Sequence, residues 1–483
     1  MRKLLVVFVM IGASLTVFSQ PISFFKTYGG TGYDFGRDAI EDYDLGYVCT
    51  GSSSSFVSEQ SDAFVMKVDT LGNFVWSRNY GGPGSEWGQS IIHTLDSNLS
   101  MAGYTNSFGN GGFDFYFLKL DTAGIVLIEK TYGGTDWDRC YSHKQLPDSG
   151  FVLVGESYSY GLGLQGYIVR TDKDGDTLWT KSWGGMEDDS FSDVLVDGDS
   201  IVVCGKTNSY GNGSSDGILI KMDNLGNIGW NQVVGQADED FFTSIKHFNN
   251  YYLLGGQRSY DYANTKEDMW VYKVEDNGNN IFYDSLYATS SEEDITMDLI
   301  VRSVNENVII AGFTKSWGLL DGFGDIIMSK YTSSFGFVTS NTFGSDQRDQ
   351  PYSIIETSDD GFLVIGDFHH QSTGGGNMYL MKNTYLWEWF DVFNDLESEQ
   401  ITTSIETTPI KNEINIFPNP FSNELFIDLP VGCEKASLYD LSGALIAVYN
   451  ESGLKDMTEI KKGVYLINFE YDTYISQEKI VRF

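Results

Sequence analysis

The sequence predicts an all-β protein: a seven-bladed β-propeller followed by a small C-terminal β-sandwich. Three observations predict this fold. The 483-residue chain has 53 glycines and 15% aromatic residues but only 8 prolines, a composition typical of short strands joined by tight turns. A unit of about 50 residues recurs along most of the chain. After the last copy, the pattern changes to short alternating strands between Pro and Gly turns.

The repeats begin with an aromatic residue followed by glycine. Successive openers are 52, 52, 51, 51, 53 and 56 residues apart. Each unit has room for four strands, which matches a propeller blade rather than the roughly 20- to 29-residue coil of a leucine-rich solenoid. The seven openers, of which the last three are degenerate, are Tyr28-Gly29-Gly30, Tyr80-Gly81-Gly82, Tyr132-Gly133-Gly134, Trp183-Gly184-Gly185, Val234-Gly235, Tyr287-Ala288 and Phe343-Gly344.

The first strand-like segment lies outside the seven units. Ile22 to Thr27 has the pattern of a fourth strand, such as Val75 to Asn79, whereas the seventh unit lacks its usual turn after Lys382. We therefore predict that the N-terminal strand completes the seventh blade and closes the ring.

Each unit also carries an acid six residues after the opener and a cation 32 to 37 residues further on. A ring of carboxylates could hold calcium or act as acid and base. A residue needed once for chemistry has no reason to recur in every blade, so we predict instead a structural acid–cation bridge at each blade interface. The acids are Asp34, Glu86, Asp138, Asp189, Asp240, Glu293 and Asp349, and the cations are Lys67, Lys119, Arg170, Lys221, Lys273, Lys330 and Lys382.

Motifs for catalysis are not found in the sequence. Asp172-Lys173-Asp174-Gly175-Asp176 resembles the start of a calcium loop, but it falls on a hairpin of the repeat and no Glu occupies the twelfth position, so we interpret it as a turn. The five histidines form no HxH or HExxH motif, and no GxSxG or phosphate-binding loop occurs. We predict no catalytic residue, no metal ligand and no cofactor.

The sharpest binding signal is an aromatic residue five positions after the strand-end glycine of six units. These residues lie beside Ser, Asn and Gly, in loops that open on one face of the ring. Such a collar could stack on sugar rings or on a peptide, and the alternative is that each ring only packs between blades. The candidates are Phe56, Phe108, Tyr160, Tyr210, Tyr260 and Trp317.

The N-terminal 19 residues are typical of a signal peptide. Arg2 and Lys3 precede an apolar run from Leu4 to Phe18. At about 15 residues this run is shorter than a membrane-spanning helix, and no other run approaches that length. We expect no transmembrane segment in the mature protein, with the propeller at 20–390 and a linker at 391–412.

The segment 413–483 contains an ordered series of short motifs: Ile416-Phe417-Pro418-Asn419-Pro420, Ala436 to Gly443, Lys462 to Ile467 and Lys479-Ile480-Val481. In this order they resemble the sorting domain of the type IX secretion system of Bacteroidetes, although Phe417 stands where that family usually has Tyr. The resemblance implies type IX machinery as a partner and, after passage through the periplasm, an extracellular or outer-cell-surface location. The residues that carry it are Pro418, Asn419, Pro420, Gly443, Gly463, Tyr465 and Lys479.

From these observations we expect an exported, non-enzymatic propeller that serves as a secreted or cell-surface binding or adhesion module for a glycan or a peptide. A secreted polysaccharide hydrolase or lyase is one alternative, because propellers also carry such chemistry, and a structural component of a surface layer is another. The formal net charge of −36 repels phosphate backbones, so nucleic acid is excluded as a partner.

Overall fold

The computed structural model describes residues 23–383, with gaps at 56–59, 237, 260–266, 280, 288–291, 317–322, 346 and 370–375, and then 402–403, 416–417, 424–427, 433–440, 445–451, 453–456, 458, 460–471 and 475–482. The predicted signal peptide therefore lies outside the described residues. The chain divides into two compact units, Met1–Thr407 and Thr408–Phe483. Within the described residues, no helix is long and apolar enough to cross a membrane.

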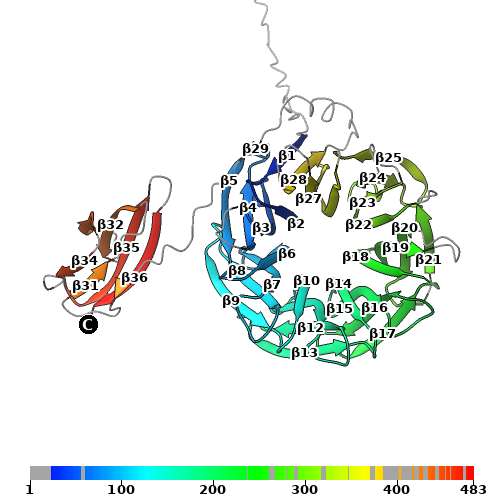
Figure 1. Ribbon diagram of the computed structural model, residues 1–483, viewed down its shortest axis with the longest axis horizontal. Helices are drawn as coiled ribbons and strands as arrows, with labels where there is room; N and C mark the ends of the chain where they lie inside the picture. The colour runs from blue at the N-terminus through cyan, green and yellow to red at the C-terminus, as the bar shows by residue number, and fades with distance from the viewer. Residues whose placement is uncertain are drawn as a thin grey trace, which may run out of the picture. The chain divides into compact units, whose positions relative to one another are not determined.

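The first unit is a seven-bladed β-propeller, as the sequence predicted (Figure 1). Each blade is an antiparallel sheet whose strands follow one another from the axis outward. The inner strands are β2 (Asp34–Glu41), β6 (Glu86–His93), β10 (Asp138–Gln145), β14 (Asp189–Asp197), β18 (Asp240–Phe248), β22 (Asp294–Val301) and β26 (Gln350–Glu356). The second strands are β3 (Tyr47–Ser53), β7 (Leu99–Thr105), β11 (Phe151–Ser157), β15 (Ser200–Thr207), β19 (Tyr251–Ser259), β23 (Val308–Thr314) and β27 (Phe362–His369).

The third strands are β4 (Asp62–Val68), β8 (Asp114–Leu120), β12 (Gln165–Thr171), β16 (Asp216–Asp223), β20 (Glu267–Glu275), β24 (Asp325–Tyr331) and β28 (Gly376–Asn383). The outer strands are β5 (Phe74–Tyr80), β9 (Val126–Tyr132), β13 (Thr177–Trp183), β17 (Ile228–Val234), β21 (Ile281–Tyr287), β25 (Phe337–Phe343) and, in blade seven, β1 (Phe24–Tyr28).

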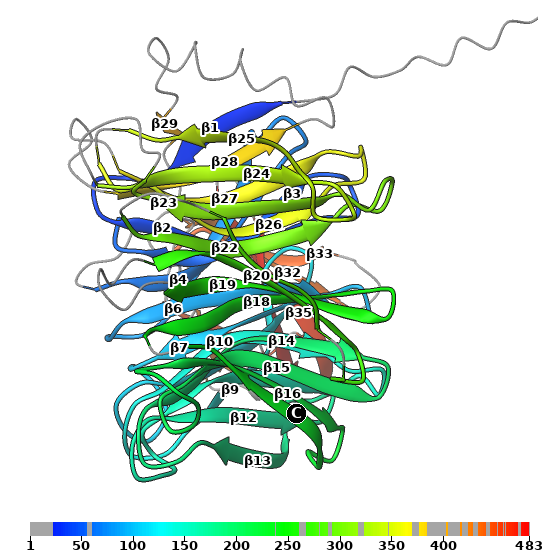
Figure 2. The same cartoon turned by 90° about the vertical axis from the view of Figure 1, so that its right-hand side faces the viewer.

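Apolar side chains on both faces of the middle strands produce this stacking. Every residue of β12 is buried, whereas the outer strand β13 alternates between exposed and half-buried positions. The sheets of successive blades therefore pack face to face around the ring (Figure 2). One core cluster, for example, joins Val65 of blade one to Ile91 and Leu118 of blade two. Burial on both faces agrees with the continuous apolar runs that these strands have in the sequence, such as that of β16.

The predicted closure of the ring is confirmed. β1 pairs antiparallel with β28, from Phe24 opposite Lys382 to Tyr28 opposite Met378. The buried hydroxyl of Tyr28 donates a 2.7 Å hydrogen bond to the carbonyl of Gly72 in the outer hairpin of blade one. Tyr80 makes the same 2.7 Å bond to Gly124. The opening aromatic thus ends one blade and bonds to the next, which explains why it recurs.

The predicted acid–cation bridges are wrong. The acid begins the inner strand of its blade, whereas the cation lies near the end of the parallel third strand, and a seven-residue strand spans roughly 20 Å. Asp138 instead accepts hydrogen bonds from the Gly134 amide at 2.7 Å and the Ser159 hydroxyl at 2.8 Å. In blade six, Asp294 takes this place by bonding Thr314, while the predicted Glu293 pairs with Lys315.

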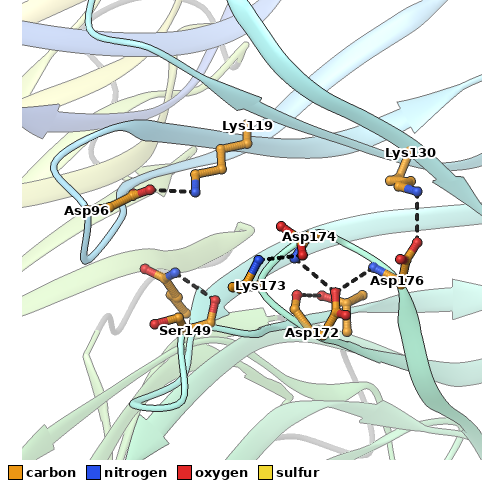
Figure 3. Close-up of polar contacts among 10 residues, drawn as sticks. Asp96, Lys119, Lys130, Ser149, Asp172, Lys173, Asp174 and Asp176 are labelled. Atoms are coloured by element: carbon orange, nitrogen blue, oxygen red, sulfur yellow. Dashed lines mark hydrogen bonds and ion pairs between the residues drawn. The ribbon is translucent and has the colours of Figure 1, made fainter.

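Among the described residues, five of the predicted cations pair at the opposite end of the blade, with acids in or beside the hairpin between the first two strands: Lys67, Lys119, Arg170, Lys221 and Lys382. Lys119 lies 2.7 Å from Asp96, and Figure 3 shows this pair. Lys221 pairs likewise with Asp197, and Lys382 with Asp359. Each of these bridges joins the third strand of a blade to the hairpin between its first two strands, and so lies within one blade rather than between two.

The segment from Asp172 to Asp176 is a hairpin turn, as predicted. One oxygen of Asp172 accepts the amide hydrogens of both Asp174 and Asp176 at 2.9 Å (Figure 3). Lys173 pairs with Asp174. The sister turn at Asp223 holds its amides in the same way, so the acid-rich sequence follows from turn geometry.

The described strands of the second unit form two antiparallel sheets. One contains β30 (Ile416–Phe417), β31 (Glu424–Ile427) and β34 (Gly453–Asp456), and the other contains β33 (Leu445–Tyr449), β32 (Cys433–Asp440), β35 (Gly463–Tyr471) and β36 (Ile475–Arg482). Leu425 and Ile427 of the first sheet share a core with Leu438 and Ile467 of the second. In the first unit, the two-residue strand β29 (Thr402–Thr403) lies parallel to β1.

Candidate ligand site at the mouth of the axial channel

Every inner strand contains a β-bulge. In β2 the register against β3 shifts between Gly36 and Asp38, which leaves Arg37 as the extra residue. A bulge leaves that residue outside the hydrogen-bond ladder and redirects its side chain. The extra residues of the seven blades are Arg37, Gln89, Tyr141, Ser192, Thr243, Met297 and Tyr352.

These seven bulged residues line a cavity of about 130 Å³ on the axis of the propeller. Lys144 and Lys246 lie further along their strands and also reach it. All seven blades contribute to the lining, so the cavity exists only when the ring is closed. The residue that follows each bulge forms a second ring: Asp38, Ser90, Ser142, Asp193, Ser244, Asp298 and Ser353.

The aspartates of this second ring connect neighbouring blades. Asp38 accepts the amide hydrogen of Ile91 in blade two at 2.9 Å, and Asp193 accepts that of Ile245 in blade five at 3.0 Å. Lys246 lies 2.8 Å from Asp298. Burial alone would lower the pKa of Lys246, but the surrounding carboxylates raise it above its usual value. These acids are therefore held by fixed donors and have a clear structural role.

Two serines of the same ring have unused hydrogen-bonding capacity. The hydroxyls of Ser90 and Ser244 are buried and contact no hydrogen-bond partner among the described residues. Buried polar groups normally find a partner in protein or ordered water. Their position in the cavity lining gives water or the hydroxyl of a ligand a place to bind.

Above the cavity, at the end where the inner strands begin, aromatic side chains form a continuous row across blades one to three. Phe35 stacks on Trp87 at 5.2 Å between ring centroids, and Trp87 on Tyr104 at 6.1 Å. Phe113 meets Tyr104 at 5.2 Å and Trp137 at 5.5 Å. We call this row, with two arginines described next, the arginine–aromatic ladder; its members are Tyr33, Phe35, Trp87, Tyr104, Phe113, Trp137, Arg37 and Arg139.

The two arginines lie on the aromatic faces. The guanidinium carbon of Arg37 is 3.7 Å from the ring centroid of Tyr352, and that of Arg139 is 4.7 Å from that of Trp137. Each arginine also pairs with an acid at 3.2 Å, Arg37 with Asp367 and Arg139 with Glu156. These pairs hold the guanidinium groups in place and leave parts of the ring faces open.

The ends of the ladder are open to solvent. Tyr33 is 55% exposed and Trp137 is 46% exposed. Burial raises the pKa of Tyr352 to about 12, so its hydroxyl stays protonated at neutral pH and can donate a hydrogen bond. The site thus combines flat apolar faces, fixed cations and hydroxyl groups around one opening.

The predicted aromatic collar lies at the same end of the blades. The Tyr160 hydroxyl donates to the carbonyl of Gly133 at 2.8 Å, and that of Tyr210 to Gly184 at 2.9 Å. Phe108 contacts Tyr116 at 6.0 Å between centroids. All three predicted residues remain more than one-third exposed. The other members, Phe56, Tyr260 and Trp317, lie outside the described residues.

Sequence reasoning missed the ladder and the bulged ring, yet a signal for the ring is present. In six of the seven units the bulged residue lies nine positions after the opening aromatic or its equivalent. The amino acid at this position differs between units, for example Arg37, Gln89 and Tyr141. A structural contact recurs in each blade, whereas a residue that contacts one ligand need not. Variation at a fixed repeat position therefore marks the channel lining.

Of the predicted sorting-motif residues, Gly463 and Tyr465 lie in β35, and the Tyr465 hydroxyl donates to the Lys461 carbonyl at 2.5 Å. Lys479 pairs with Leu466 across β36 and β35. Pro418, Asn419, Pro420 and Gly443 lie outside the described residues.

The fold and the C-terminal unit together define an exported β-propeller protein. A family model described as a secretion system C-terminal sorting domain matches residues 415–482. This match confirms the resemblance to type IX sorting domains and the link to Bacteroidetes. The chain is handled by the type IX machinery and is exported to the cell surface or the extracellular space.

Other similarities are remote. Regulatory protein FlaEY of Caulobacter vibrioides is 24% identical over 179 residues, which are 32% of this chain and 19% of that protein. Among solved structures, Sqt1 from Chaetomium thermophilum has a TM-score of 0.43 at 11% identity, covering 72% of this chain and 82% of that one. A subtype N11 neuraminidase-like protein (A/flat-faced bat/Peru) has a TM-score of 0.38 at 12% identity, covering 76% and 95%.

Proposed function

We propose that this exported propeller is a non-enzymatic binding module that takes a glycan at the mouth of its axial channel. The observation that carries the proposal is the convergence of non-repeating side chains on that mouth, within a framework whose turns and hydrogen bonds repeat. Arg37, Gln89 and Tyr141 occupy equivalent positions in three successive blades, but they share no chemistry.

The chemistry of the ladder favours a glycan over a peptide. Aromatic faces at the exposed end of the row, at Trp137, suit the flat apolar face of a sugar ring. The adjacent Arg139 and Glu156 offer charged hydrogen-bond partners for hydroxyl groups. Below them, the unpartnered hydroxyls of Ser90 and Ser244 suit further hydroxyl groups.

The cavity supports binding rather than hydrolysis. General acid–base chemistry on a glycan needs a pair of carboxyl groups free to exchange protons with the substrate. Asp38, Asp193 and Asp298 instead accept backbone amides from the next blade. The collar residues Tyr160 and Tyr210 lie beside the opener turns at the same end and extend the proposed surface.

The experiment is a glycan array with the full mature chain, followed by titration of each hit against variants. We expect Trp137→Ala to weaken binding about fivefold, because an aromatic contact is worth on the order of 1 kcal/mol. Phe337→Ala is the matched control, since Phe337 is 61% exposed on the outer strand β25. Tyr160→Ala and Tyr210→Ala test the collar.

Equal affinity of Trp137→Ala and wild type would contradict the ladder as the site. Shortened products released from a bound polysaccharide would assign a hydrolase or lyase instead. An array without hits, combined with binding of a peptide that Trp137→Ala abolishes, would keep the site and change the ligand class. For the sorting motif, we propose that the strands β35 and β36, which carry Gly463, Tyr465 and Lys479, belong to the part of the C-terminal unit that the type IX machinery recognises.

A further inference from the structure

Pairs of acids face each other at most of the junctions between blades. One acid lies at the start of the third strand of a blade, or next to it, and the other lies at the start of the inner strand of the next blade. At the two remaining junctions an amide replaces the first acid, as Gln165 beside Asp189 and Asn377 beside Asp34. The five carboxyl pairs are Asp62 with Glu86, Asp114 with Asp138, Asp216 with Asp240, Asp268 with Asp294, and Asp325 with Asp349.

Where the opener carries a glycine, as at Gly81, Gly133 and Gly235, the two carboxyl groups of the pair both lie where a side chain of that glycine would project. A Cβ at Gly81 would lie 2.2 Å from an oxygen of Glu86 and 2.5 Å from an oxygen of Asp62. The two carboxyl groups are thus inside the roughly 4–6 Å range over which one carboxylate raises the pKa of another. This crowding also explains the glycine, because a larger residue would overlap both oxygens.

Among the described residues, the hydrogen-bond donors of the Asp62 pair contact Glu86 and not Asp62. Glu86 accepts the Gly82 amide at 3.0 Å and the Thr105 hydroxyl at 2.6 Å. The other titratable group that faces Glu86 is the phenol of Tyr116 on β8, which donates to Glu129 at 2.6 Å. Burial and the Glu86 carboxylate raise the pKa of Asp62 to about 7.

Other junctions repeat this environment with local differences. At the fifth-to-sixth junction, Asp268 Oδ1 and Asp294 Oδ2 contact no hydrogen-bond partner among the described residues. Burial, with Asp294, raises the pKa of Asp268 to about 6, and burial, with Asp325, raises that of Asp349 to about 7. The fourth-to-fifth pair has a cation nearby, because Arg258 lies 4.0 Å from Asp240.

We propose that these carboxyl pairs are proton-dependent locks between blades, which make the ring most stable in mildly acidic surroundings and loosen it above neutral pH. Each lock closes when one acid of the pair takes up a proton, because protonation removes the repulsion between two buried like charges. The amide junctions support this, since Gln165 and Asn377 are neutral groups of similar shape at the same place.

The sign of the pH dependence follows from the direction of the shifts. A carboxyl whose pKa is higher in the folded than in the unfolded chain stabilises the fold when protonated. This stabilisation is complete below about pH 4 and is lost as pH rises through 6 to 7. The five histidines add their own pH dependence, so the test compares variants with one another.

The experiment measures the melting temperature of the full mature chain between pH 5 and pH 8. Asp62→Asn installs an amide at a carboxyl junction, and Gln165→Glu installs a carboxyl at an amide junction. We expect Asp62→Asn to raise the melting temperature at pH 8 by roughly 2–4 °C, with a smaller rise at pH 5. Gln165→Glu should lower the melting temperature relative to wild type at pH 8, and this loss should diminish at pH 5.

Three results would overturn the proposal. The first is equal melting temperatures of Asp62→Asn and wild type at pH 8. The second is the same loss for Gln165→Glu at pH 5 as at pH 8. The third is a rise with millimolar calcium chloride at pH 8 that is larger in Gln165→Glu and smaller in Asp62→Asn than in wild type, which would show that the pairs hold a cation rather than a proton.

Discussion

Deletion of residues 21–27 tests how the propeller ring is held closed. The deletion removes β1 up to Thr27 and leaves β28 without its outer neighbour. Phe24 is 7% exposed and packs in the core cluster of blades seven and one, and Phe25 stacks on Tyr379 at 5.4 Å. The ring would then rely on side-chain packing alone where its ends meet.

The cost can be estimated from these contacts. Burial of a phenylalanine contributes about 1.5–3 kcal/mol, and a stacked aromatic pair adds about 0.5–1.5 kcal/mol. Each backbone hydrogen bond lost from β28 adds about 1 kcal/mol. The total is on the order of 5 kcal/mol, a large part of the roughly 5–15 kcal/mol that stabilises a typical domain.

The assay is thermal and urea unfolding of the mature chain with and without the segment, followed by circular dichroism. We expect a sharp loss in melting temperature and partial recovery when a peptide of residues 21–28 is added. Phe337→Ala, on the solvent side of β25, serves as the control and should stay within about 0.5 kcal/mol of wild type. An unchanged melting temperature after deletion would refute closure by β1.

Two further predictions follow from the corrected pairing of acids and cations. Lys119→Met should change the free energy of unfolding by less than about 1 kcal/mol in urea titrations, because its partner Asp96 is 53% exposed and solvent screens the pair. Asp138→Ala should cost about 2–4 kcal/mol in the same titrations, because the half-buried Gly134 amide and Ser159 hydroxyl lose their acceptor. A larger loss of stability in Lys119→Met than in Asp138→Ala would contradict this account and support the acid–cation bridge that the sequence predicted.

The sequence was sufficient to predict the propeller, the number of blades and the closing strand. Its glycines and aromatic residues recur because every blade needs the same turn and the same bond from the opening aromatic, such as Tyr28 to Gly72, to the next blade. Repetition makes such contacts visible without a structure. The buried third strands follow from continuous apolar runs for the same reason.

The partners of the acids could not be predicted from spacing. Asp34 and Lys67 have a constant separation along the chain, yet the parallel first and third strands place them at opposite ends of a blade. In blade six, the acid six residues after the opener is Glu293, but the acid that makes the equivalent hydrogen bond is the next residue, Asp294. The bulges could not be predicted either, because a bulged residue such as Arg37 leaves the hydrogen-bond pairing between two strands without any change in the composition of the strand.

The central claim is that the mouth of the axial channel binds a glycan. A crystal structure of the mature protein with a glycan selected on the array tests it most directly. We predict electron density for a sugar ring against Trp137, with hydroxyl groups near Arg139 and the chain leading toward the cavity. Density confined to the outer strands, or to the opposite end of the channel beside hairpins such as Asp96, would contradict the claim.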